Sequence, residues 1–174
     1  MRLNVILVAL AATTAFATPA FAQVATASAT AEARGLVLQP LTLTKVDDLD
    51  FGTVIASTVA GSVSIDADTG NRSVAGGVTP VPTNVGGRAL FAGAGTYNQG
   101  VLLTLSPPAV LVSTTNAADT IVVTSMVLDS GNATLRTIDV TGAFQVGVGG
   151  NFAIAASQPN GLYKANFDLT ADYQ

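Results

Sequence analysis

The side chains of this sequence that could perform catalysis are mainly carboxylates. Asp47, Asp48 and Asp50 lie close together, and Asp66 and Asp68 form a second group. Two carboxylates on either side of a sugar linkage can hydrolyse it, one as acid and one as base or nucleophile. Aspartates of this kind also fit turns that flank strands. A glycoside-cleaving enzyme is therefore the weakest of our three functional hypotheses.

Other catalytic side chains are scarce. The sequence has no histidine and no cysteine, which removes the usual general base, thiolate nucleophiles and the common zinc sites. A serine nucleophile would need a partner such as Lys45 or Lys164, and no SxxK or GxSxG string is present. We therefore expect a protein that is not an enzyme and that carries no cofactor.

Two polar or glycine-rich strings need separate interpretations. In DADTGN (66–71), Asp66, Asp68 and Asn71 are spaced like the oxygen ligands of a calcium loop, but the closing glutamate of an EF-hand is missing. Asp and Asn also form turns by bonding their own backbone, and a turn is our first interpretation. VGVGGN (146–151) lacks the lysine and hydroxyl residue of a phosphate loop, and it predicts a bulge or a tight strand connection.

Residues 1–22 predict a cleaved signal peptide. Arg2 is followed by an apolar stretch, and Ala20 and Ala22 are small residues at the positions that a signal peptidase reads. The apolar stretch is too short to cross a membrane comfortably, so we expect no stable membrane insertion. We expect cleavage after Ala22 and export to the periplasm, the cell surface or the extracellular space.

The expected mature chain is acidic and sparsely charged. Without Arg2 it has six basic and eleven acidic residues, which gives a net charge of −5. This balance argues against nucleic acid and anionic membrane as partners. About 150 residues suit one domain with a real core. Without cysteine, that domain must rely on burial and hydrogen bonds for its stability.

Strand patterns separated by turn signals account for residues 36–174. We expect strands in the ranges 36–46, 48–56, 62–66, 72–74, 89–95, 101–106, 110–113, 120–128, 134–140 and 144–155. A Gly- and Pro-rich loop is expected at 75–88. Such spacing favours an all-β antiparallel sandwich. An outer-membrane barrel would need aromatic girdles, whereas only 6% of residues are aromatic and tryptophan is absent.

The two ends of the domain carry alternating patterns. Residues 161–174 read GLYKANFDLTADYQ, in which Tyr163, Phe167, Leu169 and Tyr173 share a face with small apolar residues. This period of two predicts one terminal strand with a buried face and an exposed face. At the other end, residues 24–35 of the expected arm (23–35) alternate alanine with polar residues. Alanine would also suit a helix, but the interleaved Ser and Thr and the following glycine favour an extended arm.

Two strings resemble a known family. PLTLTKVDDLDFGTV (40–54) and GLYKANFDLTADYQ (161–174) resemble the signatures of a bacterial secreted family, domain of unknown function 4402. More broadly, the terminal strand is similar to that of chaperone-usher pilus subunits and spore-coat-U-like proteins, in which a glycine lies fourteen residues from the end and a tyrosine is penultimate. Gly161 and Tyr173 occupy those places here.

The resemblance implies an immunoglobulin-like sandwich that lacks one strand. In pilus subunits a periplasmic chaperone fills the gap first, and the N-terminal arm of the next subunit then replaces it. By analogy, the acceptor would include Gly161, Tyr163, Phe167, Leu169 and Tyr173, and the donor arm would use Val24, Leu36 and Leu38. The chain departs from many pilins because no disulfide can form and because the arm is mainly alanine.

The first hypothesis is therefore an exported, non-enzymatic structural subunit of a surface appendage or extracellular matrix. It would assemble by β-strand complementation, as a homo-oligomer or with a periplasmic chaperone. The alternative is a monomeric secreted binding or adhesin-like module, which would use the loop at 75–88. The sequence leaves both open.

Overall fold

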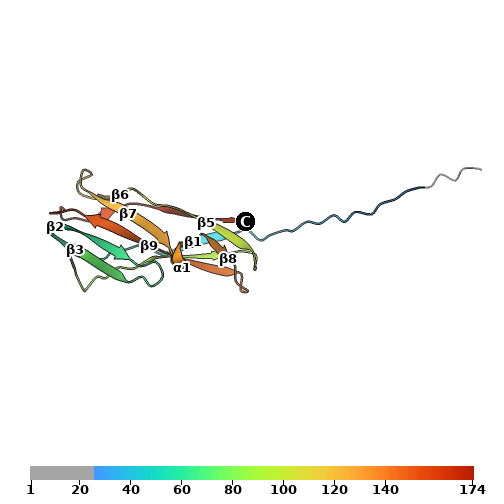
Figure 1. Cartoon of the computed structure of the whole chain (residues 1–174), viewed down its shortest axis with the longest axis horizontal. Helices are drawn as coiled ribbons and strands as arrows, with labels where there is room; N and C mark the ends of the chain where they lie inside the picture. The colour runs from blue at the N-terminus through green and yellow to red at the C-terminus, as the bar shows by residue number, and fades with distance from the viewer. Residues whose placement is uncertain (1–25) are drawn as a thin grey trace, which may run out of the picture. The chain divides into compact units, whose positions relative to one another are not determined.

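The computed structural model describes residues 26–174, and the chain within this range is almost wholly β (Figure 1). Within the described residues, the segment labelled α1 (Asp129–Asn132) is one short turn, in which Ser130 and Gly131 have left-handed φ values of 54° and 70°. The strands are β1 (Thr42–Asp47), β2 (Val54–Ile65), β3 (Arg72–Pro80), β4 (Ala89–Ala94), β5 (Gly100–Ser106), β6 (Val110–Ser113), β7 (Thr120–Leu128), β8 (Leu135–Thr137), β9 (Ala143–Ile154), β10 (Tyr163–Lys164) and β11 (Asp168–Tyr173). The expected signal peptide and Val24 lie outside the described residues.

The chain divides into two units, residues 1–36 and 37–174. In the first unit, residues 26–36 have no regular secondary structure and are exposed. In the second unit, every strand pair is antiparallel. The larger sheet has the order β1-β4-β9-β7-β6-β10, with β2 beside β9 and β3 beside β2, and the smaller sheet is β11-β5-β8. The predicted all-β antiparallel sandwich is confirmed.

Strand β9 is the centre of the larger sheet. One of its edges pairs first with β4 and then with β2, and the other edge pairs with β7. The prediction that VGVGGN (146–151) marks a bulge or a connection is wrong, because this string lies in the middle of β9. A side chain at Gly147 or Gly149 would collide with the backbone of residues 65–67. The glycines therefore let the β2–β3 turn lie against the strand.

The apolar interior forms two clusters. The first, which we call core 1, consists of Ala89, Phe91, Val101, Leu103, Leu128, Ile138, Phe144, Val146, Val148 and Leu169, so its members come from both sheets. The second, core 2, consists of Val63, Val78, Leu111, Ile121, Phe152 and Ile154, and all of these lie on strands of the larger sheet. Core 1 is thus the interior of a sandwich, whereas core 2 has no second sheet above it among the described residues.

Several strand boundaries differ from the expectation. The loop predicted at 75–88 is shorter, because residues 75–80 belong to β3 and pair with β2. The strand predicted at 48–56 begins only at Val54, because residues 50–53 form a turn, and from there it continues through the strand predicted at 62–66 as β2. The register of β2 against β3 shifts between Ala56 and Gly61. A side chain at Gly61, Gly76 or Gly77 would meet the backbone of the neighbouring strand, which explains why glycine fills this irregular pairing.

The terminal pattern also forms two strands instead of one. Tyr163 and Lys164 pair with β6 in the larger sheet, and Asp168–Tyr173 pair with β5 in the smaller sheet. Between β5 and β6 the partner segment contains Pro107 and Pro108, which have no backbone N–H to donate. The chain passes from the smaller to the larger sheet at Pro107 and Pro108. The terminal segment passes between the same two sheets at residues 165–167.

Candidate functional site

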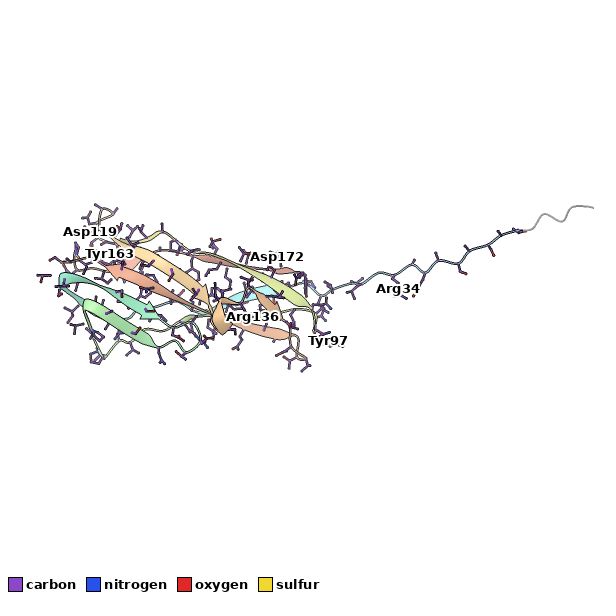
Figure 2. All side chains as sticks on the ribbon, viewed as in Figure 1. Arg34, Tyr97, Asp119, Arg136, Tyr163 and Asp172 are labelled. Carbon is purple, nitrogen blue, oxygen red and sulfur yellow. The ribbon has the colours of Figure 1, made fainter. Side chains whose placement is uncertain are left out.

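The apolar residues of the terminal segment point into both cores. Leu169 is buried in core 1, and the half-buried Phe167 and Tyr173 pack against it. Tyr163 is half-buried against core 2. Figure 2 shows Tyr163 and Asp172 toward opposite ends of this segment. The structure therefore brings the predicted residues of the terminal strand into one line along both cores.

Tyr173 fastens the end of this segment to the beginning of the domain. Its hydroxyl donates to the carbonyl of Gln39 at 2.8 Å and accepts from the backbone N–H of Thr96 at 2.7 Å. The backbone N–H of Gln39 donates in turn to Oγ1 of Thr96 at 2.7 Å. The penultimate tyrosine thus closes a small hydrogen-bonded ring around residue 39.

Gly161 and Tyr163 lie at the other end. Gly161 has a φ of 154°, which a residue with a side chain rarely adopts. The hydroxyl of Tyr163 donates to the carbonyl of Pro159 at 2.7 Å and accepts from Nε2 of Gln158 at 3.0 Å. The hydroxyl of Tyr163, the first residue of β10, therefore holds the turn that precedes this strand.

Strand β11 presents one open edge. It is the last strand of the smaller sheet and pairs only with β5, and β1 is likewise the last strand of the larger sheet. Within residues 26–174, no strand pairs with the second edge of either one. Side chains from both sides, namely Leu41 and Leu43 and also Phe167, Ala171 and Tyr173, pack on core 1. Two unpaired edges therefore border the same core.

A cavity of about 680 Å³, lined by both apolar and polar residues, opens over core 2. One wall is formed by residues 50–56, and the opposite wall by residues 158–163. The floor consists of the core residues Val63, Leu111, Ile121, Phe152 and Ile154. The terminal segment thus borders the cavity at its beginning and presents an unpaired backbone edge at its end.

The LDFG string builds the first wall of this cavity. Asp50 and Gly87 exchange two backbone hydrogen bonds, of 2.9 and 2.8 Å, and Oδ1 of Asp50 accepts from the N–H of Gly52 at 2.8 Å. Phe51 packs its ring against Phe152 in the floor. Gly52 has a φ of 68°, and a side chain there would collide with Arg72 and Asn84. The string therefore encodes a turn that places one aromatic ring in the cavity.

Arg72 holds this wall in place. Its guanidinium donates to four backbone carbonyls, those of Phe51, Thr53, Val81 and Asn84, at 2.9–3.2 Å. A planar guanidinium suits this role because its donors are fixed in a fork. In the sequence, the LDFG string is the only signal for Phe51, and nothing indicates the role of Arg72.

The predicted arm residues have different environments. Leu36 is 75% exposed, and the adjacent Val37 is 93% exposed. Leu38 is half-buried and lies next to Gln39, which is bonded at both its N–H and its carbonyl. Their role as donor residues stays a prediction.

The carboxylates of Asp48 and Asp66 bond to residues close to them in the sequence. Oδ1 of Asp66 accepts from the N–H of Asp68, the N–H of Thr69 and the hydroxyl of Thr69. The backbone hydrogen bond from Thr69 is the main reason why the pKa of Asp66 lies below its ordinary value. Asp48 pairs with Lys45 at 2.6 Å. Across residues 26–174, no group of three or more acidic side chains could hold a metal ion.

The comparisons with known proteins give one match. Residues 41–173 match the family described as Domain of unknown function (DUF4402). No curated protein and no solved structure matches the chain. Among the described residues, no helix is long and apolar enough to cross a membrane.

Proposed function

The chain belongs to the DUF4402 family, and we propose that it is an exported, non-enzymatic structural subunit of a surface appendage or extracellular matrix. It assembles by β-strand complementation, in which an extended segment of another molecule adds to the open edge of β11. The observation that supports this proposal most strongly is the unpaired edge of β11, which borders core 1 together with the unpaired edge of β1 within residues 26–174.

An added strand would satisfy two needs of the domain at once. Its backbone would bond to the unpaired edge of β11, and its alternate side chains would cover apolar surface. Each new hydrogen bond contributes about 0.5–1.5 kcal/mol net, and apolar burial contributes about 25 cal/mol per Å². A lipid or a rigid small molecule offers no row of backbone groups to this edge. The occupant that suits an unpaired strand edge is an extended peptide.

The chain offers such a segment at its other end. Residues 26–36 are exposed and form no strand within their own chain, and they alternate alanine with polar residues. Each alanine methyl group contributes about 0.8 kcal/mol when buried, whereas association costs at least about 4 kcal/mol. Backbone bonds and methyl groups together therefore predict an association that is reversible and depends on concentration.

The proposed subunit catalyses no reaction. The sequence lacks histidine and cysteine, and the aspartates at 48, 50 and 66 are occupied by an ion pair or by their own turns. Export to the periplasm, the cell surface or the extracellular space is part of the proposal and rests on the sequence of residues 1–22. A periplasmic chaperone that supplies a temporary strand would fit the same edge.

Size-exclusion chromatography with light scattering tests the proposal. The purified exported protein is compared with a variant that lacks residues 23–35, each over a hundredfold range of concentration. We expect oligomers that grow with concentration for the complete mature chain and a monomer for the variant. A stable monomer in both cases would exclude assembly through the arm. That outcome would favour the alternative, a monomeric secreted binding or adhesin-like module.

A further inference from the structure

We propose that the occupant of the open β11 edge is residues 29–34 of a second copy, paired antiparallel so that Ala31 lies opposite Ala171 and Arg34 lies opposite Asp168. This inference rests on the proposed function and adds to it the direction and register of the incoming strand. Three features of the two segments support it: side-chain phase, charge and length.

The first feature is the phase of the side chains. In β11 the odd-numbered residues Leu169, Ala171 and Tyr173 face core 1. In the arm the alanines also have odd numbers, and the polar residues have even numbers. Residues that lie directly opposite in an antiparallel pair point to the same face of the sheet. The proposed register pairs odd with odd, so the alanine face lies over the core.

Small side chains also suit this part of the core. Leu41, Leu43, Phe167 and Tyr173 already pack against core 1 along this edge. In the proposed register Ala33 lies opposite Leu169, and Ala29 lies opposite Tyr173. A strand with bulky side chains at these places would crowd an interior that is already occupied, whereas methyl groups add contact without displacing it.

The second feature is charge. On the polar face, Arg34 lies directly opposite Asp168 in the proposed register, and both are exposed. Moving the arm by two residues in one direction places Glu32 opposite Asp168, and moving it in the other places Glu32 opposite Asp172. Like charges that lie directly opposite are destabilising, and opposite charges are stabilising. Charge therefore selects one of these three in-phase antiparallel registers.

The third feature is length. Gln39 is bonded through both its N–H and its carbonyl, so residues 35–38 connect the tethered residue to the paired part of the arm. Four residues reach about 13 Å at 3.3 Å per residue, and six paired residues cover about 20 Å, the length of β11. The arm is long enough to leave its own domain and to pair along the whole of β11 on a neighbour.

Charge reversal tests the register. We expect Arg34→Glu and Asp168→Arg each to weaken self-association about three- to tenfold, measured by light scattering over a dilution series. The double variant restores association to within about twofold of the original. Asp172→Arg is the matched control, because it changes the same face of the same strand opposite Thr30. Combined with Arg34→Glu, it should not restore association. Equal rescue by Asp168→Arg and Asp172→Arg would overturn the register.

Disulfide trapping tests the direction, and the absence of native cysteine makes it specific. One chain carries Ala31→Cys, and a second chain with a mass tag carries Ala171→Cys or Ala165→Cys. The proposal predicts that a mixed dimer forms with position 171 under mild oxidation and not with position 165. A parallel arm with Arg34 opposite Asp168 would place Ala31 opposite Ala165, so the reverse result overturns the direction while leaving strand complementation intact. If oligomers form that depend on the arm but neither disulfide is trapped, the proposed register is wrong. If the protein stays monomeric and neither disulfide is trapped, the proposed function is wrong as well.

Discussion

The two cores of this domain are built from the same kinds of side chain but are covered differently. Core 1 lies between two sheets, with residues of β4 and β9 on one side and residues of β5 and β11 on the other. Core 2 is formed by strands of the larger sheet alone, and a cavity of about 680 Å³ opens over it. The comparison teaches that core 1 is covered by a second sheet with one open edge, whereas core 2 has no second sheet above it among residues 26–174.

The largest expected effect comes from a matched pair of leucines. Leu103 belongs to core 1 and is 2% exposed, and Leu111 lies in the floor of the cavity. Leu103→Ala should lower the free energy of unfolding by about 2–5 kcal/mol, because it creates a new void in a packed interior. Leu111→Ala should cost about 1–2 kcal/mol, since its site already adjoins open space. Urea unfolding measures both, and equal losses would show that core 2 is as closed as core 1.

Larger side chains should also affect the two cores differently, destabilising core 1 but not core 2. Ala89 is fully buried in core 1, so Ala89→Leu should destabilise the domain by about 1–3 kcal/mol through overpacking. Ala56 lines the cavity, and Ala56→Leu should be neutral or stabilise the domain by up to about 1 kcal/mol. Thermal unfolding checks the two signs. Destabilisation of similar size by both would contradict an open cavity.

A third pair compares the two tyrosine hydroxyls. Tyr173→Phe leaves the N–H of Thr96 and the carbonyl of Gln39 without their partner and should cost about 1–2 kcal/mol. Tyr163→Phe removes bonds within the exposed turn before β10 and should cost about half as much. Both variants keep the aromatic ring, so the difference in chemical denaturation midpoint reports the hydroxyls. A larger loss at Tyr163 would mean that the cavity end is held more tightly than the β1 end.

The smallest expected effect is on the loss of stability at low pH. The pKa values of Asp66 and Asp139 are lowered, chiefly by hydrogen bonds from Thr69 and Thr141 respectively. A carboxylate with a lowered folded pKa stabilises the fold above its unfolded pKa of about 4, and this stabilisation disappears as the pH falls through the folded pKa. The loss of melting temperature from pH 5 to pH 2 should therefore shrink slightly in the Asp66→Asn and Asp139→Asn double variant. Asp172→Asn is the control, and an equal change there would remove these turns as the cause.

Local patterns predicted much of this architecture because the period of two is a local property. The turn at DADTGN and the end of a strand before the proline pair lie where the sequence predicts them, and the alternation at 161–174 lies in strands, although in two instead of one. The antiparallel sandwich and the membership of the DUF4402 family are confirmed. The donor and acceptor roles of individual residues stay predictions.

Pairing partners could not be read from the sequence. Tyr163 and Leu169 belong to one alternating pattern, yet they lie in strands of different sheets, because the partner segment changes sheets at Pro107 and Pro108. The glycines of β9 resemble a connection in sequence, but their cause is the close approach of the β2–β3 turn. Arg72 acts on four carbonyls that are 9–21 residues away. The change of sheet, the glycines of β9 and the bonds of Arg72 all depend on contacts between segments that are distant in the sequence.

The ring of hydrogen bonds around Gln39 has a mechanical consequence. Tension that arrives along the chain from the amino-terminal side is taken up at residue 39, by the side chains of Tyr173 and Thr96, before it reaches the first ladder of the larger sheet. Because Tyr173 ends β11, the load passes directly to the carboxyl-terminal strand, which is itself anchored to β5 over six residue pairs. The domain can therefore be pulled by its leading segment without its interior being the first part to yield.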